Sequence, residues 1–192
     1  MQDSLAKHRP KKFRLGLIHG RFQSITSEHV RLYQFLIQRC EKVILMIGSS
    51  QKGGTELNPF TYEERAELIQ KALGPAQIVI LPAPDIFKGV NRLWGQHLIK
   101  IILENGFPIP EVTLSSEDTA LSDIFEDFPQ IKTWIIPRSE ISATRLREAI
   151  LQDNYAALEL LLPKGLFESL PWQKKRLLDC QGIPDSKVKI IS

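Results

Sequence analysis

The sequence has few cysteines, no long apolar run and little excess of charge of either sign. Its two cysteines, Cys40 and Cys180, lie far apart and belong to no CxxC or Cys/His cluster, which argues against a disulfide framework and a structural zinc site. No apolar run approaches the ~20 residues that cross a bilayer. The polar, basic start MQDSLAKHRPKKF lacks the apolar core of a signal peptide. These absences predict a soluble, cytoplasmic protein with no membrane partner.

The composition is that of a soluble globular domain. Hydrophobic residues make up 43% and charged residues 24% of the 192 residues, which is enough for a real core. The formal net charge of +3 is too small to indicate nucleic-acid binding, although it suits anionic small-molecule substrates. The length predicts one domain at 13–152, a flexible start at 1–12, and a helical extension at 153–192 that packs on the domain.

Short β-branched runs alternate with helical patterns along the chain. Strands are expected at 14–18, 42–47, 77–81, 111–114 and 132–136. Apolar residues at three- and four-residue spacing predict helices at 29–40, 62–73, 90–105, 120–128, 143–152, 155–162 and 165–179. Runs such as KVILMI are apolar throughout, as in strands covered on both faces. The expected fold class is therefore α/β: a Rossmann-like, doubly wound five-stranded parallel sheet with a helical C-terminal segment.

Such sheets bind ligands beyond the carboxyl ends of their strands, so the segments after the strands carry the chemistry. GRFQSITSEH leaves the first strand through Gly20, where the backbone can approach a ligand closely. Thr26 or Ser27 can cap the next helix, whose free N–H groups favour an anion. A protonated His29 in its first turn would meet phosphate oxygens. Spacing alone nevertheless favours an ordinary strand-to-helix turn with a surface histidine.

Two further segments follow the second strand. GSSQKGGT almost matches the P-loop pattern, but Gly54 stands at the lysine position and Pro59 follows before any helix begins. A flexible glycine-rich loop is the better account. In NPFTYEER, Thr61 and Glu64 predict a capping box, and a solvated side chain is a sufficient explanation of Arg65.

PAPDIFKGVNRLWGQHL follows the third strand and carries one aromatic residue of interest. Trp94 shares a helix face with Leu98 and Ile101, so packing alone can explain it. An aromatic ring near a ligand mouth could equally stack on a flat ring. The sequence leaves both roles open.

PRSEISATRLRE follows the fifth strand and concentrates basic residues at a helix start. Ser142 is a good cap, and Thr144 and Arg147 share one helix face by their three-residue spacing. Arg145 and Arg147 both oppose the helix dipole, which favours an anion site over a merely solvated amphipathic helix. A hydroxyl, free N–H groups and a guanidinium would together clamp a polyphosphate.

Taken in order, the motifs GRFQ, TSEH, NPFTYEER, PDI…NRLW and ISATRLR span nearly all of the chain from Gly20 to Arg147. This set resembles the nicotinamide-mononucleotide adenylyltransferases of the archaeal type, and the domain that some bacteria fuse to a Nudix hydrolase. That family belongs to the nucleotidyltransferase superfamily with the (H/T)xGH signature. The resemblance implies that residues 13–152 form a nucleotidyltransferase domain that transfers AMP from ATP, with Mg²⁺, to nicotinamide mononucleotide. The products would be NAD and pyrophosphate.

The chemistry suits these residues. The attacking phosphate oxygen is already ionised near neutral pH because its second pKa is about 6, so catalysis rests on in-line positioning and charge neutralisation. By resemblance, the catalytic residues would be Thr26, His29 and Arg147. ATP would be held by Gly20, Arg21, Phe22, Thr26, His29, Ser142, Thr144 and Arg147. The acceptor would contact Asp85, Asn91 and Trp94, whose ring would stack on the nicotinamide; no side chain is expected to ligate a metal.

Three positions depart from the family pattern. Glu28 stands where the signature has glycine, Ser24 where proline is common, and Leu57 where a basic residue is frequent. Glu28 adds bulk and negative charge near the phosphates. Two alternatives therefore stay open, a related transferase with another acceptor and a nucleotide-sensing or partner-binding protein without turnover. The helical residues after Ala143 could also form an interface, so a homo-oligomer is an alternative to a covering subdomain.

Overall fold

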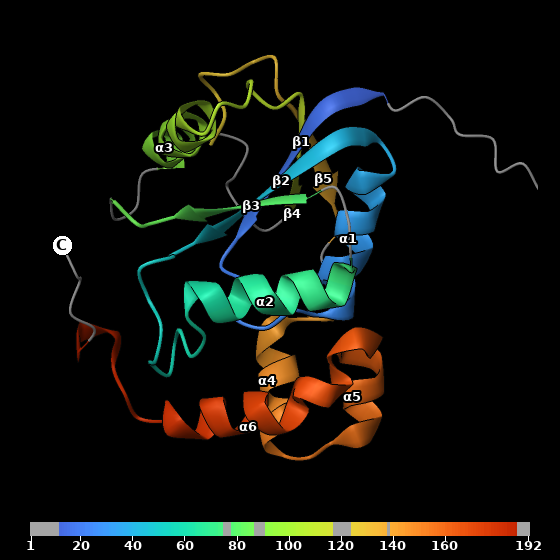
Figure 1. Cartoon of the computed structure of the whole chain (residues 1–192), viewed down its shortest axis with the longest axis vertical. Coiled ribbons are helices and arrows are strands. Elements are labelled where there is room, and N and C mark those ends of the chain that lie inside the picture. Colours follow the sequence, from blue (N-terminus) through green and yellow to red (C-terminus); the bar gives the residue numbers. More distant parts are fainter. Residues whose placement is uncertain (1–11, 75–77, 87–90, 117–123, 138, 188–192) are drawn as a thin grey trace, which may run out of the picture.

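The computed structural model describes residues 12–74, 78–86, 91–116, 124–137 and 139–187. Five strands form one sheet (Figure 1): β1 (Phe13–Gly20), β2 (Cys40–Gly48), β3 (Ile78–Ala83), β4 (Val112–Ser116) and β5 (Lys132–Ile136). Their order is β3-β2-β1-β4-β5, and each neighbouring pair is parallel. The order reverses between β1 and β4, which is where sheets of this kind form their ligand crevice. The expected fold class is confirmed.

Helices cover both faces of the sheet, which explains why its central strands are apolar throughout. One face carries α1 (Ser27–Ile37) and α2 (Tyr62–Leu73), and the other carries α3 (Asn91–Glu104) (Figure 1). Successive side chains of β1 point to opposite faces of the sheet. Leu17 packs in the core beneath α3, and Ile18 packs in the core beneath α1 and α2. The alternation of side chains along a strand therefore divides the core into two clusters.

The C-terminal segment is helical and lies below α1 and α2 in Figure 1. Its elements are α4 (Ala143–Leu151), α5 (Tyr155–Leu161), the 3₁₀ helix η2 (Lys164–Ser169), α6 (Leu170–Asp179) and the 3₁₀ helix η3 (Asp185–Lys187). Leu146, Leu158 and Leu177 belong to the same buried cluster as residues of β1, β2 and α2. The helices after β5 therefore extend the main core. The flexible start expected at 1–12 lies outside the described residues except for Lys12.

One expected helix is wrong in its described part. Residues 124–127 of the 120–128 prediction form turns, and Pro129 disfavours helical backbone at the residue before it. These turns pack closely against α3, because a Cβ placed at Gly95 would lie only 1.7 Å from the carbonyl oxygen of Ile124. Glycine is thus needed at that point of the helix.

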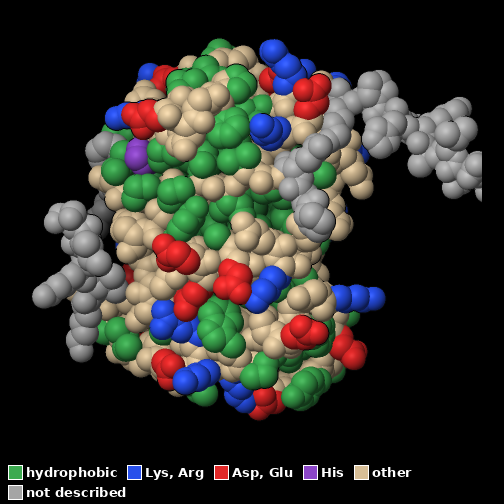
Figure 2. All heavy atoms as spheres, viewed as in Figure 1, with side chains coloured by type: hydrophobic (Ala, Val, Ile, Leu, Met, Phe, Trp, Pro, Cys, Tyr) green, Lys and Arg blue, Asp and Glu red, His purple; other side chains and the backbone are tan. Residues whose placement is uncertain are grey.

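The edge of the sheet at β3 is incompletely covered by α2. Figure 2 shows hydrophobic side chains exposed in this region, above the more highly charged C-terminal helices. A cavity of about 520 Å³ lies there, lined by Tyr62, Ala66, Ile69, Gln70, Leu73, Gly74, Ile78 and Ile80. Among the described residues, no helix combines the length and the apolar composition that crossing a membrane requires.

Candidate active site

A cavity of about 640 Å³ opens at the carboxyl ends of β1, β4 and β5, beside the point where strand order reverses. Its wall is built from the end of β1, the loop that follows, α1, α3 and the start of α4. Seven of the residues that the sequence predicted for the site line it: Gly20, Arg21, Phe22, Thr26, His29, Trp94 and Ser142. The structure therefore brings together motifs that lie more than a hundred residues apart in sequence.

The loop after β1 holds an unusual backbone conformation. Phe22 is buried and has a φ of 51°, in the left-handed region that a bulky residue rarely adopts. Its ring lies so close to the backbone that a Cβ placed at Gly20 would be 2.9 Å away. The ring also meets His29 edge-on, with centroids 5.5 Å apart. Gly20 and Phe22 therefore shape the loop and orient the histidine.

Thr26 and His29 form a reciprocal cap at the start of α1. The hydroxyl of Thr26 accepts the backbone N–H of His29 at 3.3 Å. The backbone N–H of Thr26 donates to Nδ1 of His29 at 3.1 Å. Because a backbone N–H can only donate, Nδ1 must accept and the ring proton must lie on Nε2. Thr26 is fully buried, so its clearest role is to fix the ring of His29.

His29 is neutral, contrary to the expectation of a protonated imidazole. Burial lowers its pKa to about 4, against a smaller opposing effect of the Glu28 charge. The ring also stacks on Tyr33, with centroids 6.2 Å apart. His29 can therefore offer a phosphate oxygen one Nε2–H donor but not a full positive charge.

Two arginines supply the positive charge. The guanidinium of Arg147, on α4, donates to the carbonyl oxygen of Gln23 at 3.1 Å and to the hydroxyl of Thr144 at 3.3 Å. Burial lowers the pKa of Arg147, and the nearby charge of Arg21 lowers it further. In the described part of the chain, no carboxylate forms an ion pair with either arginine. Two adjacent guanidinium groups without a counter-ion favour a polyanionic ligand.

Ser142 and Arg145 complete the start of α4. The hydroxyl of Ser142 accepts the backbone N–H of Arg145 at 3.2 Å, as the expected cap. The guanidinium of Arg145 turns away and bonds the carbonyl oxygen of Glu140 at 2.8 Å. The two arginines of this helix therefore differ in their partners, and the three-residue spacing of Thr144 and Arg147 identified the pair that is hydrogen-bonded.

Arg65 is fully buried, so the expectation of a solvated side chain is wrong. Its guanidinium donates only to backbone carbonyl oxygens among the described residues: those of Arg21 at 2.7 Å, Gly48 at 2.8 Å, Thr61 at 3.0 Å, Ser49 at 3.1 Å and Lys52 at 3.3 Å. Desolvation lowers its pKa to about 10. A signal was present in the sequence, since Arg65 shares the core-facing stripe of α2 with Leu68 and Ile69.

Glu28 lines the cavity, but its charge is compensated. Its two carboxylate oxygens accept hydrogen bonds from Nε and an Nη of Arg31, at 2.8 and 2.6 Å. These bonds to Arg31 lower the pKa of Glu28. Leu57, which stands where the family often has a basic residue, is 56% exposed. The substitution of glycine by glutamate is thus accompanied by a bidentate partner one helical turn away.

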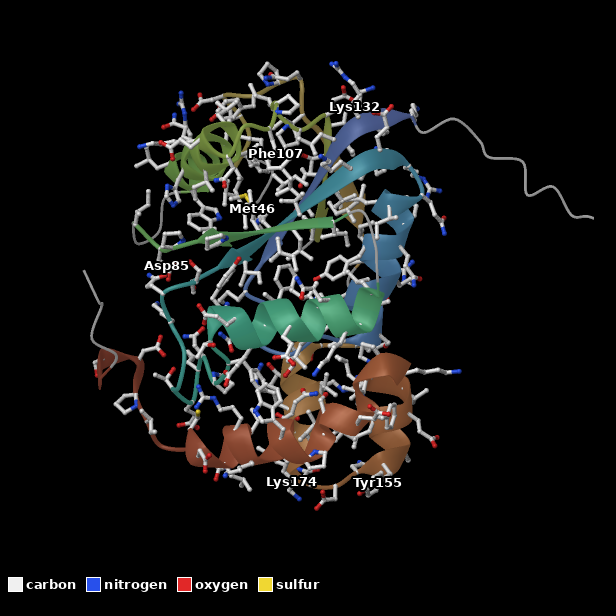
Figure 3. All side chains as sticks on the ribbon, in the orientation of Figure 1. Met46, Asp85, Phe107, Lys132, Tyr155 and Lys174 are labelled. Carbon is white, nitrogen blue, oxygen red and sulfur yellow. The ribbon has the colours of Figure 1, made fainter. Side chains whose placement is uncertain are left out.

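The residues expected for the acceptor are only partly brought together. Trp94 lines the cavity, and its Cζ2 lies 3.8 Å from where a Cβ of Gly48 would be. Asp85 lies at the carboxyl end of β3 (Figure 3), outside the cavity wall, where it accepts from Ser49 at 3.0 Å and pairs with Lys52 at 3.1 Å. Asn91 begins α3, and its side chain lies outside the described residues.

The glycine-rich loop after β2 is anchored by the far end of the chain. The carboxylate of Asp185 accepts hydrogen bonds from the hydroxyl of Thr55 at 2.5 Å and from Nδ2 of Asn58 at 3.0 and 3.1 Å. Lys52 lies 3.7 Å from the same carboxylate. No local pattern in the sequence indicates these contacts.

Comparison with known proteins gives consistent results. A family model described as cytidylyltransferase-like matches residues 17–149. The nicotinamide-nucleotide adenylyltransferase of Saccharolobus solfataricus is 35% identical over 162 residues, covering 80% of this chain and 87% of that protein. The protein of the same name from Thermococcus kodakarensis is 27% identical over 160 residues and covers 80% of each chain.

Two solved structures show a similar fold. One is a bifunctional NMN adenylyltransferase/ADP ribose pyrophosphatase from Francisella tularensis complexed with AMP and a manganese ion, with 23% identity and a TM-score of 0.61. It covers 73% of this chain, and the matched region is 42% of that chain. The other is the NadR protein in complex with NAD and AMP-PNP, with 11% identity, a TM-score of 0.56, and coverage of 80% of this chain and 46% of that chain. This chain thus spans less than half the length of both.

Proposed function

Since the chain belongs to the nicotinamide-nucleotide adenylyltransferases, within the cytidylyltransferase-like family of nucleotidyltransferases, we propose that it transfers AMP from ATP to nicotinamide mononucleotide. The products are NAD and pyrophosphate. One observation carries the proposal: the guanidinium groups of Arg21 and Arg147 lie together without a carboxylate partner among the described residues, and Arg21 lines the cavity together with His29. This is the charge arrangement that a triphosphate requires.

The ends of two helices reinforce this charge. Thr26 caps α1 and Ser142 caps α4, and both line the cavity. Each helix start presents free backbone N–H groups and the positive end of its dipole. Phosphate groups bound between the starts of α1 and α4 would therefore meet N–H donors and positive dipole ends from two sides. Thr144 contributes by holding the Arg147 guanidinium at 3.3 Å.

In the proposed reaction a phosphate oxygen of the mononucleotide attacks the α-phosphorus of ATP. A new P–O bond forms in line as the bond to the bridging oxygen of the β-phosphate breaks, and pyrophosphate leaves with the electron pair. The attacking phosphate has a second pKa of about 6 and needs no general base near neutral pH. His29 therefore acts as a neutral hydrogen-bond donor, while Arg147 and Arg21 offset the charge that develops on the leaving group.

A divalent ion, Mg²⁺ in our proposal, would enter with the nucleotide. In the described residues, no group of three or more His, Cys, Asp or Glu side chains could hold a metal ion. The donor set therefore suits an ion that is bound by the phosphates, where it would neutralise part of their charge. Arg21, His29 and Arg147 would then orient the phosphates themselves.

Trp94 is the proposed platform for the acceptor ring. Its indole forms part of the cavity wall, above the bare backbone of Gly48 at the end of β2. A flat, cationic pyridinium ring would stack on it favourably. Asp85 would contribute indirectly, through Ser49 and Lys52, and Asn91 stays a proposed contact of the acceptor.

The Glu28–Arg31 pair bears on the alternative of a homologue without turnover. An uncompensated carboxylate at the cavity would repel phosphates. Because Arg31 binds both oxygens of Glu28, the departure from the family signature leaves no net charge at that place. The pair supports a working site over a decayed one.

The test uses the purified full chain with ATP, Mg²⁺ and nicotinamide mononucleotide. NAD is detected by mass spectrometry and pyrophosphate by a coupled enzyme assay. We expect the two products in equal amounts. ATP binding in calorimetry without any NAD would contradict the proposal, and pyrophosphate release with a different mononucleotide would identify another acceptor.

A further inference from the structure

His19 immediately precedes Gly20 at the end of β1, and its side chain faces the cavity. In the parallel register it is the partner of Met46, two residues before Gly48. Side chains alternate along a strand, so His19 shares a sheet face with Leu17, which packs in the α3 core. Trp94 of α3 lines the same cavity. His19 and Trp94 therefore belong to one wall, on the side opposite α1.

The surroundings of His19 are apolar. Its ring meets Phe125 edge-on, with centroids 5.9 Å apart and planes at 80°. Ile124 and Trp94 line the cavity beside it. Within the described part of the chain, no hydrogen bond satisfies its ring nitrogens, and burial lowers its pKa to about 4. The imidazole is thus neutral near pH 7, with one donor and one acceptor unused.

An unused polar group in an apolar wall is costly unless a ligand or water satisfies it. The other charged groups among the described lining residues, Arg21 and Glu28, belong to the loop after β1 and to α1. Glu28 is already paired with Arg31. On the wall that carries Trp94, His19 therefore offers the substrate ring a neutral imidazole with both a donor and an acceptor, and the hydroxyl of Ser115 on β4 lines the same cavity.

We propose that His19 determines which acceptor ring the site takes, by exchanging a hydrogen bond with an uncharged carboxamide substituent of a ring stacked on Trp94. The inference rests on the proposed function and adds a specificity residue to it. A carboxylate in place of the carboxamide would lose its hydration in this wall without meeting a cation, and one neutral imidazole cannot offset that loss. Selection for the carboxamide then follows from the absence of charge on His19.

The experiment compares nicotinamide mononucleotide with nicotinic acid mononucleotide, which differ only in this substituent. We would measure kcat/KM for both in the unsubstituted protein and in the variants His19→Leu and His19→Gln. Leucine removes both hydrogen-bonding nitrogens at similar volume, whereas glutamine keeps a donor and an acceptor. His19→Lys serves as the converse variant, because it places a cation in the same wall.

We expect the unsubstituted protein to prefer the carboxamide. His19→Leu should lower kcat/KM for it about tenfold, the effect of about one neutral hydrogen bond, with the KM for ATP unchanged. The carboxylate acceptor should lose less than about threefold, because it gained little from His19. His19→Gln should retain the preference, and His19→Lys should shift it toward the carboxylate.

An equal loss for both acceptors in His19→Leu, or an unchanged ratio, would overturn the inference. Thermal melting of each variant separates this result from misfolding, and His19→Gln carries the test if the leucine variant does not fold. If the unsubstituted protein makes no dinucleotide from either acceptor, the proposed function fails by itself. In that case the dissociation constants of the two mononucleotides, measured by calorimetry on the same variants, test the role of His19. His19→Leu should weaken binding of the carboxamide about tenfold and binding of the carboxylate less than about threefold.

Discussion

Arg65 of α2 donates a hydrogen bond of 2.8 Å to the carbonyl oxygen of Gly48, the last residue of β2. The same nitrogen donates to the carbonyl oxygen of Arg21, in the loop after β1, at 2.7 Å. One buried side chain therefore sets the spacing of two loops that follow neighbouring strands. Because Arg21 lines the cavity, a residue that does not itself line the cavity helps to fix its shape.

Replacing Arg65 should destabilise the protein strongly. Arg65→Met leaves several buried carbonyl oxygens without a donor, and we expect the free energy of unfolding to fall by about 3 kcal/mol or more. Arg65→Lys keeps the charge but has fewer donors, so its loss should be intermediate. Urea denaturation measures both. Arg14→Met, at an exposed ion pair with Glu111, is the matched control and should change stability by less than about 1 kcal/mol. Equal losses in Arg65→Met and Arg14→Met would refute a role for the buried bonds.

The Glu28–Arg31 pair predicts a compensated double substitution. Arg31→Met leaves the Glu28 carboxylate uncompensated at the cavity, so the KM for ATP should rise about threefold to tenfold. Glu28→Gln removes the charge, and the double variant should return the KM to near its original value. Steady-state kinetics at varied ATP concentration provides the measurement. Simple addition of the two single effects would mean that the pair does not act as a unit.

The two arginines of α4 should differ sharply in their effect on activity. Arg147→Ala removes a guanidinium group that lies beside Arg21 and has no carboxylate partner among the described residues, and we expect kcat/KM to fall about 10²- to 10³-fold. Arg145→Ala is the control, because its guanidinium turns toward Glu140, and it should stay within about threefold. NAD formation and pyrophosphate release should fall together. Similar losses in both variants would contradict the assignment of Arg147 to the phosphates.

Stability should fall in mild acid because of two histidines of the cavity wall, His19 and His29. Burial lowers the pKa of His19 and of His29 from 6.5 to about 4, so between these values the unfolded chain binds more protons than the folded one. The free energy of unfolding should decline as the pH falls from 6.5 toward 4, with a limiting slope of about 1.4 kcal/mol per pH unit for each ring. Urea denaturation at several pH values measures the slope.

The variant His19→Gln measures how much the imidazole of His19 contributes to the pH dependence of the free energy of unfolding. Carboxylates such as Glu28, whose pKa is also lowered, contribute a loss of the same sign in acid. They are present in both proteins, so the difference between the two slopes belongs to His19. An identical slope in the variant would show that His19 titrates near its ordinary pKa in the folded protein.

Much of the fold could be predicted from local patterns. Apolar runs marked the strands because both faces of the sheet are covered, and Thr61 with Glu64 marked the start of α2 through their capping box. The order of motifs after strands correctly placed Gly20, Arg21 and Ser142 at one cavity. Parallel strands bring their carboxyl ends to one edge, so this convergence follows from the alternation of strands and helices.

What the sequence did not show depends on contacts between distant residues. The burial of Arg65 requires acceptors 17 and 44 residues away, at Gly48 and Arg21. The neutral state of His29 depends on desolvation and on the direction of one backbone N–H. His19 followed the apolar run of the first expected strand and belonged to no motif. In each case the residue type was visible, but the environment that sets its charge or role was not.

The contact between Asp185 and Thr55 has a consequence for the way the protein is made. Asp185 follows Thr55 by 130 residues, so the ribosome must add that length of chain before the anchor of this loop exists. The parallel sheet around β1 can form earlier, because its strands precede Asp185. A nascent chain would then hold a nearly complete cavity beside a loop that still lacks its contact with Asp185. The loop after β2 would therefore gain this anchor only after the sheet and the helices that precede Asp185 have been made.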